Sequence, residues 1–256
     1  MAMTNHRGSR ITALSGRTAR ELLRDPLSWV LALAFPLLML GMFTIIDNSI
    51  PPEAGMTRFA PGNIGPGILV FAQCFLTLFV SLLVSGDRDN AFLTRLLVTP
   101  AVPMEFHLGY VLPAAVLGLA QGILTMLAVW LLSLIRGQAL PLTGCLGAVL
   151  CGLPTLFFCI GLGIFLGSLL SSKAAPGISS VILSAASFLG GCWMDPALLG
   201  EEFETVCTLL PWYPAARMGR FLLGMEDWHR QDPAAVCFWG ALFFLLSCHV
   251  MKKRIW

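Results

Sequence analysis

Cysteine and histidine are the residues of this sequence that could ligate a metal or act as nucleophiles. The chain has eight cysteines and four histidines. Metal and redox sites place such residues in close pairs, as in CxxC or HExxH, and neither pattern occurs. Seven of the cysteines lie inside apolar runs, where a free cysteine packs as a small apolar side chain. Because the GxSxG pattern of serine hydrolases is missing as well, we expect no catalytic residue and no metal site.

The stretch GSLLSSKA, residues 167–174, is the nearest approach to a nucleotide site. A phosphate-binding loop requires GxxxxGK[ST], so that backbone N–H groups cradle the phosphates and a hydroxyl reaches the metal ion. Ser172 stands at the second glycine position and Ala174 at the hydroxyl position. We therefore expect that the chain binds no ATP and no other cofactor of its own.

The composition is that of a chain embedded in lipid. Hydrophobic residues make up 57% and charged residues 12%, whereas soluble domains carry about 25% charged residues. The net charge is +2, and basic residues cluster only near the termini, so a nucleic-acid partner is not expected. The elements that must position any functional group are therefore membrane segments.

Six stretches free of Asp, Glu, Lys and Arg are long enough to cross a bilayer as helices, which takes about 20 residues. They are apolar on every face, without the alternation of a transmembrane barrel. Gly163 and Gly167 form the small-xxx-small spacing of closely packed membrane helices. The sequence therefore predicts one all-α membrane domain over residues 1–256 with six transmembrane helices. The predicted spans are about 26–46, 64–86, 107–135, 143–171, 174–194 and 233–251.

The basic residues indicate which ends of these spans face the cytoplasm. An even number of spans puts both termini on one side, and eleven of the 16 Lys and Arg residues fall on that side. The positive-inside rule then predicts a multi-pass protein of the cell (plasma) membrane with both termini in the cytoplasm.

Two segments outside the spans have patterns of their own. Residues 10–25 form a basic amphipathic pattern, and we expect an interfacial helix anchored in the inner leaflet by Arg17, Arg20 and Arg24. The alternative is a positive flank that only fixes the topology. Residues 195–232 carry seven of the 14 acids, yet their middle part is half apolar. This combination predicts short outer re-entrant helices that dip into the outer leaflet.

The centres of the predicted spans contain no charged residue, although ion-coupled transporters usually keep such groups in the membrane. Gln73 and Gln121 are the notable polar residues there, and we expect them to line a transport cavity. Uphill transport by this chain would then have to draw its energy from another subunit.

Three stretches, in this order, resemble the type-2 ABC (ABC-2 type) transporter permeases. ARELLRDPLSWVLALAFPLLMLGMF, residues 19–43, has an amphipathic helix and an Arg-Asp-Pro break before the first span. AFLTRLLVTPAVPMEFHLGYVL, residues 91–112, is similar to the Leu-x-x-Thr-Pro cytoplasmic loop of the family. FLGGCWMDPALL, residues 188–199, and LLPWYPAARMGRFLLG, residues 209–224, resemble the exit of the fifth span and the outer segment.

The cytoplasmic loop departs from the family pattern in two places. It begins DRDNAFLT instead of the Glu-rich, Gly-Thr-containing start that is common in the family. Gly109 and Tyr110 stand where a lysine often precedes the third span. Both departures concern the detail of subunit docking rather than the class of protein.

The resemblance implies two six-span halves, identical or different, assembled with two ABC ATPase subunits that bind the ATP. A short helix before Pro100 would couple the permease to the ATPase. Phe92, Leu93 and Leu96 would insert into a groove of the ATPase, and Arg95 would pair with its surface acids. The alternative is a helical turn that only caps two spans.

The expected function is the permease subunit of an ATP-driven exporter, which is not itself an enzyme. An apolar cavity with a few amides fits an amphipathic or hydrophobic cargo, such as a drug, a lipid-like molecule or a peptide, better than a free ion. The alternatives are an ATP-independent channel or facilitator and a membrane sensor without transport. Membrane lipids are expected contacts in each case.

Overall fold

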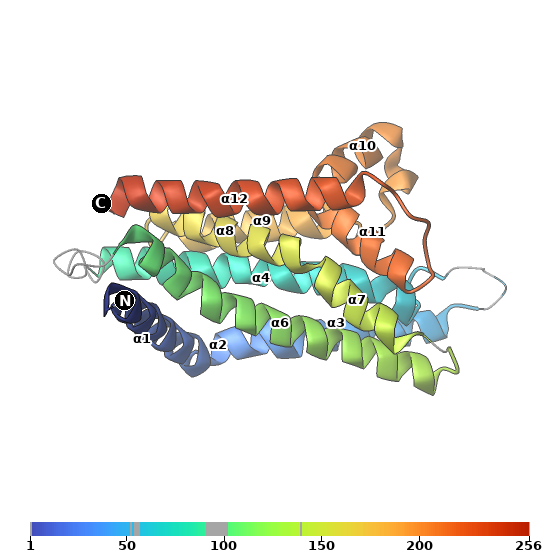
Figure 1. Ribbon diagram of the computed structural model, residues 1–256. Helices are drawn as coiled ribbons and strands as arrows, with labels where there is room; N and C mark the ends of the chain where they lie inside the picture. Colours follow the sequence, from blue (N-terminus) through green and yellow to red (C-terminus); the bar gives the residue numbers. More distant parts are fainter. Residues whose placement is uncertain (1, 52, 54–56, 91–101, 139, 256) are drawn as a thin grey trace.

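Long helices lying side by side make up the computed structural model of the chain (Figure 1). It describes residues 2–51, 53, 57–90, 102–138 and 140–255, and every regular element in these ranges is helical. In chain order the elements are α1 (Ala2–Arg24), α2 (Pro26–Trp29), a π-helical turn (Val30–Ala34), α3 (Phe35–Ser49), α4 (Pro61–Asp89), α6 (Pro103–Ile135), α7 (Leu142–Cys151), α8 (Leu153–Leu169), α9 (Ala175–Leu189), a 3₁₀ turn (Pro196–Leu199), α10 (Glu201–Leu209), α11 (Trp212–Leu222) and α12 (Asp232–Ile255).

Five helical stretches in the described part of the chain are long and apolar enough to cross a membrane. They cover Val30–Ser49, Pro61–Asp89, Pro103–Ile135, Leu142–Leu169 and Asp232–Lys253. A helix satisfies its backbone N–H and C=O groups internally, which lipid surroundings require. The all-α membrane architecture predicted from the sequence is thereby confirmed, and five of the six predicted spans fall on these stretches.

The predicted span 174–194 corresponds to a shorter helix. α9 has 15 residues, which at 1.5 Å per residue extend about 22 Å, less than the hydrocarbon core of about 30 Å. The helix ends before Gly190 and Gly191, and Gly191 has a φ of +58°, which a helix cannot continue. The described part of the chain therefore contains five helices of spanning length, and the sixth predicted span stays a prediction.

The central helix of the bundle is α4, which lies between α6 and α8 in Figure 1. Its most apolar window is 83% buried inside the chain. On α8, a Cβ on Gly163 would lie 2.9 Å from the carbonyl oxygen of Thr77, and one on Gly167 would lie 2.7 Å from that of Ser81. The tight packing predicted from the glycine spacing is therefore confirmed, because only glycine lets the two backbones approach so closely.

Two irregularities interrupt the apolar helices, each next to a proline or a glycine. Pro36 has no N–H to donate to the carbonyl of Ala32, and the turn Val30–Ala34 is π-helical. Gly152 separates α7 from α8, and Pro154 lies in the first turn of α8. The fourth predicted span is thus built from two helical pieces.

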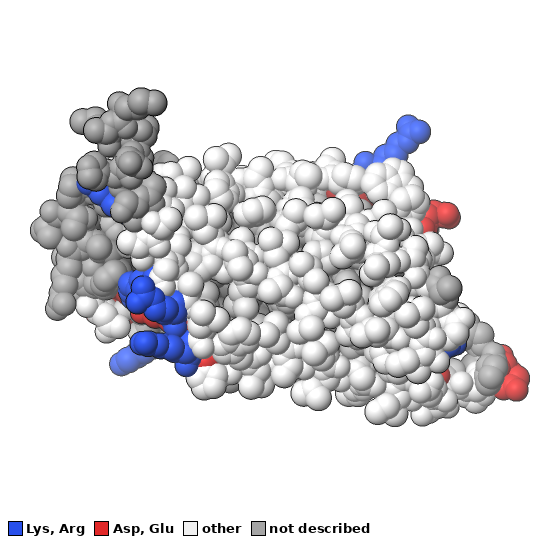
Figure 2. Space-filling model, turned by 60° about the horizontal axis from the view of Figure 1, so that its bottom comes forward, with Lys and Arg blue, Asp and Glu red and all other residues white. Residues whose placement is uncertain are grey.

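Charged groups gather at the two ends of the bundle. One end, here called the terminal end, carries both chain termini, the end of α4 and the α8–α9 turn, and the opposite end carries α10, α11 and the start of α4 (Figure 1). On the face shown in Figure 2, the described Lys, Arg, Asp and Glu residues lie towards these two ends. The wide band between them carries no visible charge on this face, as expected for a surface surrounded by lipid.

α1 begins earlier than the predicted interfacial helix and packs against α6. Leu22 is buried, and a Cβ on Gly109 of α6 would lie 2.9 Å from the Cβ of Leu14. Arg20 and Arg24 are exposed on α1. The amphipathic pattern is therefore present, with part of its apolar side on α6. The position of α1 in a headgroup layer stays a prediction.

The segment 195–232 contains short broken helices, as the sequence predicts. Gly200, with a φ of +105°, separates the 3₁₀ turn from α10. Pro211 precedes α11 and has no N–H with which to continue α10. Whether these helices dip into a lipid leaflet stays a prediction.

Candidate functional site

The predicted coupling residues Phe92, Leu93, Arg95 and Leu96 lie outside the described residues. Both flanks of this stretch are described, namely the end of α4 up to Asn90 and the start of α6. The candidate site is therefore built from the polar groups of these flanks at the terminal end.

Asp87, in the last turn of α4, joins three helices through its carboxylate. Arg17 of α1 donates from Nη1 to Oδ2 at 2.8 Å, and the hydroxyl of Tyr110 of α6 donates to the same oxygen at 2.5 Å. Nη2 of Arg17 donates to Oδ1 of Asp87 at 2.5 Å and to Glu21 at 2.7 Å. The hydrogen bond to Asp87 and the nearby carboxylates raise the pKa of Arg17 above its ordinary value, so the side chain stays a cation. Asp87 is only 7% exposed, and these partners compensate its burial.

The next two residues of α4 hold the turn between α8 and α9. Arg88 donates to the carbonyl oxygens of Ser168 and Leu170, both at 2.8 Å. These carbonyls belong to the end of α8, where a helix leaves acceptors unsatisfied and favours a cation. The carboxylate of Asp89 accepts from the backbone N–H of Ser172 at 2.8 Å. The end of α4 and the α8–α9 turn are thus fastened to each other at three points.

The start of α6 is fixed on the other flank of the stretch. The carboxylate of Glu105 accepts from the backbone N–H of Val102 at 3.1 Å, which caps the helix. Arg10 of α1 lies 4.0 Å from the same carboxylate. One turn along, Nε2 of His107 and the hydroxyl of Ser247 of α12 are 2.8 Å apart. The residues on both sides of 91–101 are therefore bonded to α1, α6, α12 and the α8–α9 turn.

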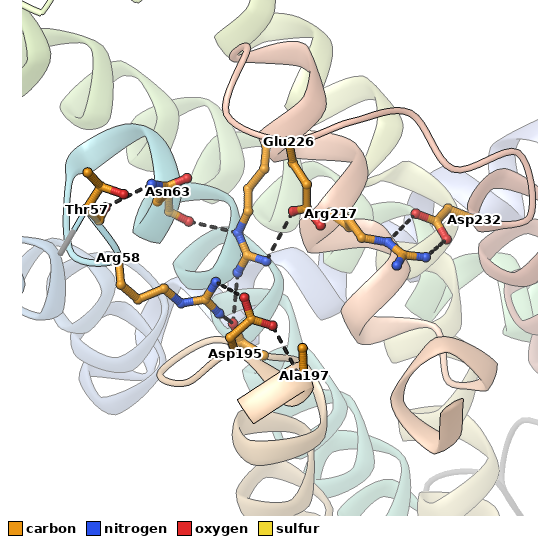
Figure 3. A network of polar contacts seen from close by, with 10 residues as sticks. Thr57, Arg58, Asn63, Asp195, Ala197, Arg217, Glu226 and Asp232 are labelled. Carbon is orange, nitrogen blue, oxygen red and sulfur yellow. Dashed lines mark hydrogen bonds and ion pairs between the residues drawn. The ribbon is translucent and has the colours of Figure 1, made fainter. Parts of the chain in front are cut away.

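A second polar network lies at the opposite end and centres on arginines of α11 (Figure 3). Arg217 forms a bidentate ion pair with Asp232 at the start of α12, with Nε 2.8 Å from Oδ2. The two side chains are 4% and 2% exposed. The guanidinium of Arg217 also lies over the ring of Tyr213, 5.1 Å from its centre. This pair holds the end of α11 against the last long helix.

Arg220, one turn later, bonds to backbone carbonyls of two other segments. Its Nε donates to the carbonyl of Asn63 in α4 at 3.0 Å, and Nη2 donates to that of Gly191 after α9 at 2.8 Å. Arg58, in the loop before α4, donates to the same Gly191 carbonyl at 2.6 Å. Burial and the neighbouring Arg220 cation lower the pKa of Arg58. The two arginines thus tie α4, α11 and the turn after α9 together.

The family follows from a match over most of the chain. The sequence model of the ABC-2 type transporter family covers residues 9–222. The chain belongs to the ABC-2 type transporter family. The match includes the stretch 87–103 and both arginines of α11. The comparison with curated proteins found no match.

As a member of the ABC-2 family the chain is a multi-pass membrane permease, a component of a transporter. One of its two departures from the family pattern, the pair Gly109 and Tyr110, has a structural reason. Gly109 gives room to Leu14 of α1, and Tyr110 donates to Asp87. Both residues therefore serve the contact between α1, α4 and α6.

Gln73 and Gln121 of this ABC-2 permease lie inside the helix bundle, 2% and 1% exposed. Nε2 of Gln121 donates to the carbonyl of Ala72 at 3.0 Å, and Gln73 lies against the α7–α8 break at Gly152. The side-chain oxygens of both glutamines lack a hydrogen-bond partner among the described residues. They could reach a cavity only if the surrounding helices separate, and their role there stays a prediction.

Sequence reasoning missed three groups that organise the two ends. Asp87 is the first charged residue after the charge-free run 59–86, and nothing local shows that Arg17, 70 residues away, faces it. Arg17 donates to Asp87 in the structure, which the sequence does not predict, and its role as an inner-leaflet anchor stays a prediction. The burial of Arg217 and Arg220 was also unforeseen, although the apolar composition around them was a usable signal, since arginines there need internal partners.

Proposed function

We propose that this ABC-2 permease is one half of an ATP-driven exporter whose ATPase binds at residues 87–103 on the cytoplasmic side of the plasma membrane. Two halves, identical or different, would enclose the transport path, and two ABC ATPase subunits would supply the energy. Membership of the family supports the ATPase partner. The excess of basic residues at the terminal end supports its cytoplasmic placement.

The observation that carries this proposal is the set of bonds around the end of α4. Asp87 is bonded to α1 and α6, and Arg88 and Asp89 are bonded to the α8–α9 turn. A displacement of residues 91–101 would move α1, α6 and the α8–α9 turn together. Charged hydrogen-bonded groups between packed helices resist independent motion of those helices. A turn that only caps two spans has no need of such connections.

We infer that α9 makes the sixth crossing in spite of its length. Ser172, before the helix, bonds to Asp89 at the terminal end, and Gly191, after it, accepts from Arg58 at the opposite end. The stretch 172–191 therefore runs from one polar end to the other. This path supports six spans and puts both termini on one side.

α1 as an inner-leaflet anchor and the helices of 195–232 as outer re-entrant elements complete the proposed topology. Arg20 and Arg24 are exposed, which suits contact with lipid phosphates. On α10, Val206 and Leu209 are 49% and 66% exposed. Apolar side chains on a helix of an outer segment favour immersion in the leaflet over a position in water.

Capture of an ATPase by the tagged permease tests the coupling proposal. Phe92→Asp and Leu96→Asp should each abolish capture, because a carboxylate cannot enter an apolar groove without a partner. Leu23→Asp is the matched control, since this leucine is 56% exposed on α1, outside the predicted contact. It should leave capture intact.

Two results would count against the proposal. If capture and ATP hydrolysis both survive Phe92→Asp and Leu96→Asp, the stretch is not the coupling element. If no ATPase is captured and vesicles containing the permease alone show passive flux, the channel or facilitator is the better assignment.

The proposed cargo is amphipathic or hydrophobic. The described interior offers apolar walls with the amides of Gln73 and Gln121, and the centres of the spans contain no charge that would compensate a free ion. ATP-dependent uptake by inverted vesicles of a lipophilic drug, a lipid-like molecule and a hydrophobic peptide would decide among the three classes. Uptake of none of them, with uptake of an inorganic ion, would reject the proposed cargo.

A further inference from the structure

A hollow of about 650 Å³ lies at the opposite end, between the loop before α4, the turn after α9 and the residues after α11. Its apolar walls come from Phe59, Trp193, Met194, Leu198 and Met225. Two arginines and two acids converge on its polar side. Apolar walls around a few convergent polar groups are the usual composition of a small-molecule site.

The polar side of the hollow contains guanidinium groups with unused donors. Arg58 and Arg220 both donate to the carbonyl of Gly191, and Arg220 is 2% exposed. Nη1 of Arg220 and Nε of Arg58 have no hydrogen-bond partner among the described residues. Leaving such donors unsatisfied in a buried position is costly, so a ligand that accepts from them gains binding energy. Phosphate and carboxylate oxygens are the acceptors that best match a guanidinium.

Asp195 faces Arg58 (Figure 3), and Glu226 faces Arg220, without forming hydrogen bonds to them. Asp195 lies 3.6 Å from Nη1 of Arg58, and Glu226 lies 3.7 Å from Nη1 of Arg220. Burial raises the pKa of Glu226, because its charge is poorly solvated where it stands. Glu226 therefore leaves Nη1 of Arg220 without a hydrogen bond, while its carboxylate stays beside the place that a bound anion would take.

We propose that this hollow binds the anionic group of an amphiphile, a phosphate or a carboxylate, on Arg58 and Arg220. The apolar part of the ligand lies against Trp193 and Met225. The site goes beyond the export function, since it concerns binding by the permease alone at the end remote from the ATPase contact. A failure of the coupling proposal leaves it untouched.

Native mass spectrometry of the purified permease in a neutral detergent, titrated with lysophosphatidic acid, tests this site. One bound molecule is expected. Arg58→Gln weakens binding by about tenfold or more, because a charged donor is lost. Glu226→Gln strengthens binding by a factor on the order of three to ten, because a competing negative charge beside Arg220 is removed. An increase in affinity is not expected if the two residues serve only the fold.

Arg136→Gln is the matched control, since Arg136 lies at the same end, pairs with Asp47 and stays outside the hollow. It should leave the affinity unchanged. Glu226→Gln keeps the proposal testable if Arg58→Gln does not fold. Equal or weaker binding by Glu226→Gln would overturn it.

Two further probes separate the sources of the anion. Inorganic phosphate should compete with lysophosphatidic acid only at far higher concentration, because it lacks the apolar part. A neutral monoacylglycerol should not compete. Competition by free phosphate at the same concentration as the lipid would mark a plain anion site, and equal binding of the neutral lipid would mark non-specific partition. Either result overturns the proposal.

Discussion

Both ends of the bundle contain ion pairs between arginines and carboxylates, but the pairs at the two ends join different helices. At the terminal end, Arg17, Asp87 and Tyr110 come from three helices, of which α4 and α6 flank the stretch 91–101, and Arg17 is 29% exposed. At the opposite end, Arg217 and Asp232 are 15 residues apart in the chain and almost fully buried. The first network links helices around a predicted contact. The second fixes one short helix in place.

This difference in burial indicates that the two ends have different roles, one in coupling and one in stability. A charge pair that keeps contact with water can be rearranged at modest cost, whereas a fully buried pair cannot lose a partner without leaving an uncompensated charge. We therefore expect substitutions at the opposite end to act mainly on stability. Substitutions at the terminal end should act mainly on coupling.

The largest effect is expected for Arg217→Gln. It leaves Asp232 buried without its cation, which should lower the free energy of unfolding by about 3–5 kcal/mol. Thermal unfolding in detergent measures the change. Arg230→Gln, at an exposed position of the same segment, is the control and should have little effect. If Arg217→Gln lowers the free energy of unfolding by less than Arg17→Gln does, the proposed contrast between the two ends is wrong.

Gly163→Val tests whether the bundle between the ends is rigid. The added side chain meets the backbone of Thr77 in α4, which should cost about 1–3 kcal/mol of stability by overpacking. Gly177→Val in α9 is the control, because a Cβ there has nothing within 4 Å. Equal stability of the two variants would mean that α4 and α8 can separate freely and would weaken the case for transmission between the ends.

A double-mutant cycle of Arg17→Gln and Asp87→Asn measures the link between α1 and α4. We expect an interaction energy of about 1–2 kcal/mol, because the pair is hydrogen-bonded but only partly buried. The same cycle with Arg20→Gln in place of Arg17→Gln should give about zero, since Arg20 donates to its own helix at Gly16. Additive effects of Arg17→Gln and Asp87→Asn would remove the structural basis of the coupling proposal.

Tyr110→Phe is expected to have the smallest effect on stability, about 1 kcal/mol, because one of several bonds to Asp87 is lost without a change in shape. Unfolding of the variant in detergent checks the value. If Tyr110→Phe lowers the stability as much as Asp87→Asn does, then Tyr110, rather than Arg17, is the main partner of the carboxylate.

The membrane architecture could be predicted from the sequence because apolar length is a local property. The same holds for the packing of Gly163 and Gly167, where two small residues four apart mark a close helix contact. The length of α9 could not be predicted, because its apolar run continues through Gly190 and Gly191. The helix nevertheless ends there in the left-handed turn of Gly191.

The polar networks could not be predicted because their partners are distant in sequence. Arg17 and Asp87 are 70 residues apart, and Arg220 and Asn63 are 157 apart. On a helical wheel Arg17 shares a side with Arg20 and Arg24, so the amphipathic pattern predicts that all three anchor the helix at the inner leaflet. Its true partner appears only when α4 is placed beside α1. The predicted coupling residues, Phe92 to Leu96, stay a prediction, since they lie outside the described residues.

Transmission from the ATPase contact to the opposite end tests the central claim most directly. A fluorophore on Met225→Cys, in a background with Cys151, Cys237 and Cys248 replaced by serine, would report on the hollow, because Met225 is 42% exposed there. In the complex with its ATPase, addition of ATP should change the signal of the parent, and Arg17→Gln should abolish the change while ATP hydrolysis continues. An unchanged ATP response in Arg17→Gln would contradict the claim that Asp87 and its partners carry the motion.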